Sequence, residues 1–334
     1  MSATTSTFIR VPASYARYDV DTTVTAGLLG LPDGEAGELA TTHLPYVRDP
    51  GRGPLFDHAD VVNLALFHSN TGCTVPDLAL RFLLRFATAP QSTWYEPRWW
   101  LVRVCPPPAL LDRARDGSAQ LSIEPADLAA PGVVPLDAPD AAALRQARPT
   151  AKAILPPGYE VAVRITGAEA TVHDGRARGL YQEMVDALAG GAVTYQSVNE
   201  GLRARHREAW QLGMADCVVA SRLLADRLRD AGLTARARRG YLLGLVGSDH
   251  AWCELYEDDH WKPMDLAFAF LASGGSGTRR INATPEFVAA CCGSRFNRLL
   301  PGQAPDALPL VHLDGEPAPP WLPVAVSAHP GEAR

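Results

Sequence analysis

One segment near the middle of the chain constrains the fold more than any other. Its apolar residues recur at the spacing of one helix face: Val219, Leu223, Leu224, Leu228 and Ala231. This pattern predicts an amphipathic helix over residues 217–231. Asp216 is a good N-cap and Gly232 a good stop signal. Such a helix must bury its apolar face against another element, so a packed core is expected around it.

The residues around this helix predict a mixed fold. Three runs with β-like composition follow it, at residues 234–246, 250–256 and 261–266. Helical patterns are expected at residues 74–86, 179–188, 198–212 and 284–292, and a short strand at residues 162–165. Consecutive β-runs separated by short polar stretches favour antiparallel pairing between them.

The remaining segments suggest how the chain divides. Residues 1–50 are polar and interrupted by Gly and Pro, which predicts strands and loops rather than a long helix. Residues 106–158 show little periodicity, and the last 34 residues hold eight prolines, which is typical of an extended tail. We expect an N-terminal elaboration over 1–170, which could serve as a lid or substrate-binding domain, a core over 171–300 and a Pro-rich tail over 301–334.

Composition excludes several classes of protein. The 334 residues carry a formal net charge of −6, which argues against a general nucleic-acid binder. No apolar run reaches the 18 or so residues of a membrane span, and the N-terminus lacks a signal-peptide core. We expect a cytoplasmic protein without a membrane partner.

The cysteines do not suggest a metal site or a disulfide scaffold. The six cysteines form no CxxC pair, and no HExxH motif is present. His68 and Cys73 lack a third ligand at a suitable spacing. We therefore expect neither a metal nor another cofactor.

Cys217 is different because it begins the predicted helix. The backbone N–H groups and the positive end of the helix dipole favour a thiolate there. A reactive thiolate also needs a base, which His250 can supply from the next β-runs, with Asp265 as the third member.

Strand geometry decides whether His250 and Asp265 can meet. Side chains alternate between the faces of a strand. A turn at Glu257–Asp258 places His250 directly opposite Asp265, whereas a turn at Asp258–Asp259 leaves them diagonal on the same face. A three-residue loop would separate them. With either two-residue turn, the three side chains form a Cys-His-Asp set suited to nucleophilic acyl chemistry.

The residues around these positions resemble a known superfamily. The segments GMADC at 213–217, LRDAGLTAR at 228–236, GY at 240–241 and HAWCEL at 250–255, with Trp261 and Asp265, are similar to the transglutaminase-like cysteine superfamily. The likeness covers about residues 179–270. It implies the α+β fold class, with a papain-like core in which the nucleophile helix packs on an antiparallel sheet and with Cys217, His250 and Asp265 as the triad. Papain-like enzymes carry an oxyanion-hole glutamine six residues before the nucleophile, where this chain has Gln211, and Trp210 is the alternative donor.

Two further groups are candidates for binding. A tryptophan cluster with Trp94, Trp99 and Trp100, together with Trp252, could form a wall for an apolar substrate, or simply belong to the core. Residues 203–239 hold nine arginines against four acidic residues. This basic segment could dock an acidic acyl or peptidyl carrier protein or its phosphopantetheine phosphate, or be a solvated helix face. Its candidate docking residues are Arg227, Arg229, Arg236 and Arg238.

These features leave several functions open. A peptidase or amidase, an amide-forming acyltransferase and a cyclase would all use an acyl-Cys217 intermediate. A binding module without a triad is less consistent with the three residues present. In size and triad spacing the chain resembles the Dieckmann cyclases that release polyketide–peptide hybrids as tetramic acids or pyridones. That resemblance implies a carrier-bound β-ketoacyl-aminoacyl thioester as substrate.

Overall fold

The computed structural model describes residues 8–67, 74–106, 108–123, 126–135, 159–244, 248–273, 283–306, 311–319 and 325–330. His68 and Cys73 lie outside the described residues. The helices are α1 Thr22–Leu29, α2 Asp33–His43, α3 His58–Phe67, α4 Val75–Leu84, the 3-10 helix η1 Arg85–Thr88, α5 Ser92–Tyr95, α6 Pro108–Arg115, α8 Gly175–Ala189, α9 Glu200–Ala204, α10 His206–Gln211, α11 Cys217–Asp230, α12 Leu266–Ala272 and α13 Pro285–Ala290.

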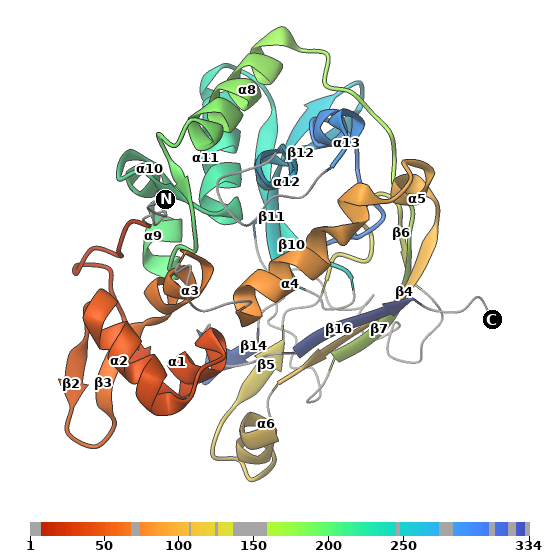
Figure 1. The fold of residues 1–334 in the computed structure, drawn as a ribbon. Coiled ribbons are helices and arrows are strands. Elements are labelled where there is room, and N and C mark those ends of the chain that lie inside the picture. The colour runs from red at the N-terminus through yellow and green to blue at the C-terminus, as the bar shows by residue number, and fades with distance from the viewer. Residues whose placement is uncertain are drawn as a thin grey trace.

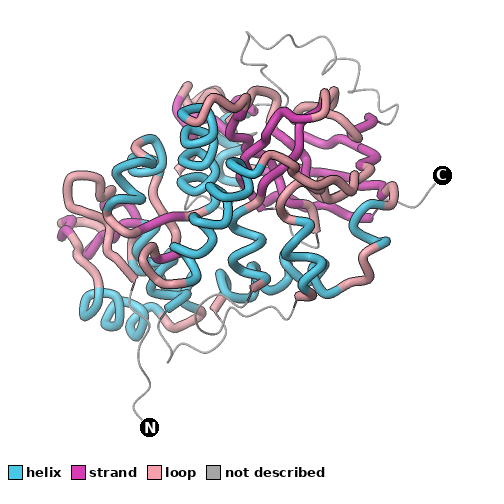
Figure 2. Tube along the Cα trace, turned by 90° about the horizontal axis from the view of Figure 1, so that it is seen from above, coloured by secondary structure: helices cyan, strands magenta, loops and turns pink. Residues whose placement is uncertain are grey.

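The strands are β1 Tyr18–Val20, β2 Val47–Asp49, β3 Gly53–Asp57, β4 Arg98–Cys105, β5 Leu121–Ile123, β6 Val133–Pro135, β7 Tyr159–Ile165, β8 Thr194–Tyr195, β9 Met214–Ala215, β10 Ala235–Leu242, β11 Ser248–Glu257, β12 His260–Met264, β13 Leu299–Pro301, β14 Val311–Leu313, β15 Glu316–Pro317 and β16 Ala325–Pro330. In the view from above, most strands gather on one side and the helices lie beside them (Figure 2). The mixture of helices with antiparallel sheets confirms the α+β expectation.

The predicted central helix is present as α11, and the sheet beside it has the strand order β12-β11-β10-β13 (Figure 1). All neighbouring strands in it are antiparallel. Apolar residues of α11, including Val219 and Leu224, share one buried cluster with Ala237 of β10 and Cys253 of β11. The sheet and the helix therefore bury their apolar faces against each other.

The turn between β11 and β12 lies at Asp258–Asp259. Glu257 pairs with His260 and Tyr256 with Trp261, so the register with a turn at Glu257–Asp258 is wrong and the alternative is confirmed. Asp258 and Asp259 have φ angles of 53° and 60°. Two consecutive positive φ angles are those of a type I′ turn, whose twist suits a two-residue hairpin. Aspartate tolerates this conformation better than glutamate does.

Gly240 explains how β13 packs closely against β10 at the edge of the sheet. It pairs with His250 on one side and with Pro301 on the other. A Cβ atom at this position would lie 2.2 Å from the carbonyl oxygen of Leu300 and 2.7 Å from the Pro301 Cα. Only glycine permits this close approach of β13 to β10.

The expectation for residues 1–50 is wrong in part, because the helices α1 and α2 lie in this segment together with the strands β1 and β2. Asp21 caps α1, accepting a hydrogen bond from the Val24 backbone N–H, and Gly30 ends the helix in the left-handed conformation. These helices share a separate apolar cluster with Phe56 and Leu64. Tertiary packing and caps outweigh the weak local pattern of a glycine-containing segment.

Two other segments differ in detail. The single helix expected over 198–212 is divided into α9 and α10 at Arg205, whose φ and ψ are −111° and 48°. The Pro-rich tail supplies strands: β14 pairs with β5, and β16 pairs with β4. None of the helices in the described ranges has the length and apolar character that a membrane span needs.

Candidate active site

Cys217 is the first residue of α11 and is half-buried. The Asp216 carboxylate accepts hydrogen bonds from the backbone N–H groups of Val218 at 3.0 Å and Val219 at 2.9 Å. The cap thus leaves the Cys217 N–H without a hydrogen bond in the described part of the chain. A thiol and a free N–H at the positive end of a helix can stabilise negative charge on the sulfur and on an adjacent oxygen.

His250 and Asp265 meet as the second sequence register requires. The His250 Nε2 lies 2.6 Å from the Asp265 Oδ2, and both side chains are buried. The Cys217 side chain lies near enough to the same imidazole to raise its pKa. Because Nε2 binds Asp265, Nδ1 is the ring nitrogen left for the thiol. The three side chains therefore converge into the set that the sequence predicts.

Asp265 is held in place by its position between two elements. It follows β12 directly and is the N-cap of α12. Its Oδ1 accepts from the Phe268 N–H at 2.9 Å, so each carboxylate oxygen has its own donor. The Tyr181 hydroxyl donates to the Asp265 carbonyl at 3.1 Å. This fixed carboxylate orients the imidazole and selects its tautomer.

Aromatic rings cover the His250 imidazole. The Phe268 ring is stacked on it with a centroid separation of 4.4 Å and an interplanar angle of 8°. The Trp252 ring lies on the same strand with its centroid 6.0 Å away. Sequence reasoning missed Phe268, although its position three residues after the Asp265 cap was a usable signal. The rings limit the access of water to the imidazole.

The environment favours a charged imidazole. Burial lowers the pKa of His250, but the Asp265 carboxylate and its hydrogen bond raise it, and Cys217 adds to this, so that the pKa reaches about 10. His250 therefore carries its proton at neutral pH. A proton-carrying imidazole near a half-buried thiol at a helix N-terminus suits acid–base chemistry on that thiol. By contrast, burial raises the pKa of the Cys253 thiol, which lies in the core as expected.

A second polar cluster supports the helix end. The Arg203 Nε lies 2.6 Å from the Asp216 Oδ2, and its Nη1 lies 2.6 Å from the Glu200 Oε1. Arg239 is buried and also binds Glu200. Burial raises the pKa of Glu200, but the two guanidinium groups lower it to about 2. Arg203 thus fixes the cap of the nucleophile helix, a role that the local sequence does not reveal.

The two oxyanion-hole candidates occupy different surroundings. Gln211 is exposed at the end of α10, and Trp210 is half-buried against the main core. The chain turns at Gly213, with a φ of 82°, before β9 leads to Asp216. The Gln211 side chain makes no hydrogen bond with the described residues, and its role stays a prediction.

The candidate docking arginines are mostly paired with acidic residues from other segments. Arg238 is buried and lies 3.1 Å from Asp127, so a role in docking a protein partner is wrong for this residue. Arg236 binds Glu254 at 2.7 Å. Arg227 pairs with Glu183. Arg229 contacts Asp226. These partners were not all visible in the local charge count, because several come from distant segments.

The four tryptophans considered as a substrate wall lie in different surroundings. Trp94 and Trp100 are buried in two different apolar clusters and donate hydrogen bonds to the backbone carbonyls of Phe86 and Asn297, so a substrate wall is wrong for them. Trp99 is half-buried beneath Arg164. Trp252 alone of these four lies against the His250 ring.

Comparison with known proteins gives one family match and one similar solved structure. No curated protein matches the sequence. Among solved structures, the chain is similar to a "putative cysteine protease" from Cytophaga hutchinsonii, with 11% identity over 72% of this chain and 92% of that chain and a TM-score of 0.35. The family model of the transglutaminase-like superfamily matches residues 160–266, about a third of the chain. The matched segment includes Cys217, His250 and Asp265, and it is similar to the domain that this superfamily shares.

Proposed function

We propose that the protein is a cysteine-dependent acyl transfer enzyme that cyclises a β-ketoacyl-aminoacyl thioester through an acyl-Cys217 intermediate. The observation that carries the proposal is the convergence of Cys217 with His250 and Asp265 at the start of a capped helix. The aromatic cover on His250 favours cyclisation over hydrolysis, because water near the acyl-enzyme competes with the internal nucleophile.

The first half-reaction transfers the acyl group to the enzyme. The Cys217 thiolate attacks the thioester carbonyl, and the free N–H of Cys217 donates to the oxygen that becomes negative. Gln211 is the proposed second donor, with Trp210 as its alternative. The departing thiolate takes the proton from the His250 Nδ1. This step leaves a neutral imidazole and an acyl-Cys217 thioester.

The second half-reaction closes the ring. The neutral His250 Nδ1 removes a proton from the carbon between the two carbonyls of the β-ketoamide. The resulting carbanion attacks the acyl-Cys217 carbonyl, a C–C bond forms, and the C–S bond breaks. The product leaves as a tetramic acid-type ring, and the thiolate–imidazolium pair is restored. Asp265 stabilises the imidazolium in both half-reactions.

The proposed acyl donor is a phosphopantetheine thioester on a carrier protein. Arg227 and Arg229 lie in the last turn of α11, and their side chains are partly exposed. They remain candidates for contact with an acidic carrier, whereas the buried Arg238 does not. Small thioesters bypass this contact and test the chemistry alone.

The test uses an N-acetylcysteamine thioester of a β-ketoacyl amino acid, with products identified by mass. We expect wild type to release a cyclic product without addition of water or amine, and the Cys217→Ala variant to be inactive. Cys105→Ala, which removes another half-buried thiol on β4, is the matched control and should retain activity.

Other outcomes contradict the proposal in different ways. A free acid would identify a hydrolase, and an amide formed with an added amine would identify an acyltransferase. In both cases the triad would remain the catalytic site, but the reaction would be hydrolysis or amide formation and not cyclisation. Full activity in Cys217→Ala would refute Cys217 as the nucleophile.

A further inference from the structure

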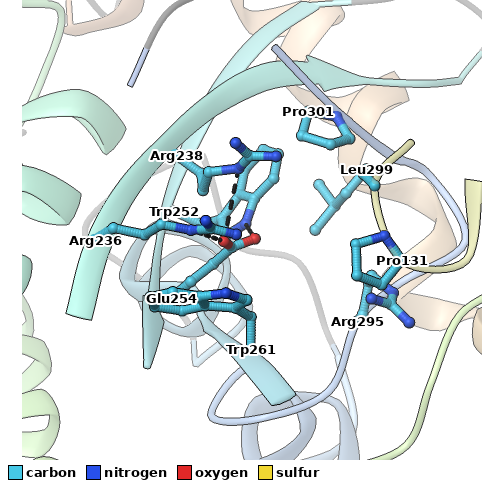
Figure 3. A pocket seen from close by; sticks show the side chains of 10 residues that line it. Pro131, Arg236, Arg238, Trp252, Glu254, Trp261, Arg295, Leu299 and Pro301 are labelled. Carbon is cyan, nitrogen blue, oxygen red and sulfur yellow. Dashed lines mark hydrogen bonds and ion pairs between the residues drawn. The ribbon is translucent and has the colours of Figure 1, made fainter. Parts of the chain in front are cut away.

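A small pocket lies along the same sheet, with Trp252 among its lining residues (Figure 3). One wall consists of sheet residues from β10, β11 and β12, and the facing wall comes from the loop before β6 and the segment around β13. The lining residues that matter here are Arg236, Arg238, Trp252, Glu254, Trp261 and Arg295. His250 precedes Trp252 by two residues on β11, so the pocket begins about 7 Å along the strand from the imidazole.

Carboxylates balance the arginines on the sheet wall. The Glu254 carboxylate accepts from the Trp252 Nε1 at 3.1 Å and from the Arg236 Nε at 2.7 Å. It also lies 3.6 Å from the Arg238 Nε. Arg238 has a second partner, Asp127, at 3.1 Å. Glu254 and Asp127 therefore offset the charges of Arg236 and Arg238.

Arg295 brings a third guanidinium that lacks such a partner. Its Nε is buried and unpaired, and no carboxylate within the described ranges forms an ion pair with it. Gly132, with a φ of 76°, lets the loop pass close to this guanidinium: a Cβ there would lie 3.3 Å from Nη2. Burial lowers the pKa of Arg295, while Glu254 opposes this effect. A buried Nε–H group without a partner is costly, and a ligand oxygen could satisfy it.

Aromatic surfaces complete the pocket. The Arg236 guanidinium carbon lies 3.9 Å from the centre of the Trp261 ring. Trp252 forms the end nearest the triad and contacts His250 through its ring. In Figure 3 the Trp261 ring and Glu254 lie across the pocket from Pro131 and Arg295. The surroundings thus combine flat apolar surfaces with one uncompensated positive charge.

We propose that this pocket binds an anionic group of the thioester substrate, with Arg295 as the charge partner and Trp252 linking the bound group to the triad. This inference rests on the proposed function, since it assigns the substrate of that same site. A carboxylate or phosphate fits the chemistry, because both accept hydrogen bonds from guanidinium groups. Two sources can provide it: a carboxylate on the acyl-amino acid part, or the phosphate of a phosphopantetheine arm.

The experiment measures binding rather than turnover, with Cys217→Ala protein and isothermal titration calorimetry. One pair of probes is 4′-phosphopantetheine and pantetheine, and the other is N-acetylaspartate and N-acetylasparagine. In one of the two pairs, we expect the anionic member to bind with an affinity at least about 10-fold higher than that of its neutral partner. The pair that shows the preference identifies the source of the anion.

Variants assign the preference to the pocket. Arg295→Gln should abolish it, while Arg295→Lys, which keeps the charge, should retain part of it. Arg103→Gln is the control, because it removes an exposed guanidinium paired with Glu160 on β7. Equal binding of the anionic and neutral members in both pairs would overturn the proposal, as would a preference that survives in Arg295→Gln.

The two proposals fail separately. Binding to the Cys217→Ala protein needs no reaction, so a hydrolytic product in the activity test leaves the anion preference intact. Conversely, a cyclic product combined with absent anion preference would support the chemistry and refute the pocket assignment.

Discussion

Both ends of α11 carry an arginine–carboxylate ion pair, but the two pairs differ in burial and therefore in their effect on the helix. At the N-terminal end, Arg203 is 16% exposed and Asp216 is 7% exposed, and their pair fixes the cap beside Cys217. At the C-terminal end, Arg227 pairs with Glu183, whose side chain is 63% exposed. A buried pair cannot be broken without leaving a charge in the interior, whereas an exposed pair exchanges its partner for water.

This difference shows why a local charge count misleads. Residues 203–239 have five more arginines than acidic residues, yet Arg222 binds Asp306 and Arg239 binds Glu200. The excess is offset by carboxylates brought from other segments. The function of each arginine therefore depends on its burial and partners, and the N-terminal end is the one coupled to chemistry.

The largest effect is expected where the buried network meets the imidazole. Asp265→Asn replaces the acceptor of the His250 hydrogen bond and should lower kcat by about 10³- to 10⁴-fold, because the amide cannot stabilise the imidazolium. The amide oxygen can still cap α12, so the unfolding midpoint in urea should stay close to that of wild type. If the variant is much less stable than wild type but its folded fraction keeps the wild-type kcat, Asp265 has a structural role and not a catalytic one.

The next prediction compares the two helix ends directly. Arg203→Met leaves the buried Asp216 carboxylate without its guanidinium partner and should lower the free energy of unfolding by about 3–5 kcal/mol. Arg227→Met, the matched change at the other end, should cost about 1 kcal/mol or less. Chemical denaturation of both variants measures the contrast. Similar losses at both ends would show that burial does not separate them.

The smallest expected effect is a pH dependence of the unfolding free energy, which comes from His250 beside the N-terminal end of α11. The pKa of His250 rises from its ordinary value of 6.5 to about 10 on folding. The stability from its charged form is complete below pH 6.5 and is lost as pH rises towards 10, because the unfolded chain releases the proton first. Between pH 7 and 8 the loss is on the order of 1 kcal/mol.

Urea denaturation of wild type and a His250→Gln variant measures this term. Their difference in unfolding free energy should shrink as the pH rises, while the arginines of the other end contribute nothing in this range. A constant difference between pH 6.5 and 10 would contradict a raised His250 pKa.

The sequence by itself determined the helix that begins at Cys217 and the parity that brings His250 and Asp265 to one face. Both follow from local rules: a cap, an apolar period of 3.6 residues and a strand alternation of two. A two-residue turn at either place puts His250 and Asp265 on the same face, so this prediction did not depend on which of the two registers is correct.

Only the tertiary structure decided the surroundings of the triad. Local sequence patterns do not predict which residues of different segments come together. Three such contacts are the Phe268 ring on His250, the pair of Arg203 with Asp216, and the unpaired Arg295 opposite Glu254. Trp94 and Trp252 look alike in sequence, yet packing places one in the core and the other beside the imidazole. Burial and long-range partners are properties of the folded chain, and they set the charge and accessibility on which the chemistry depends.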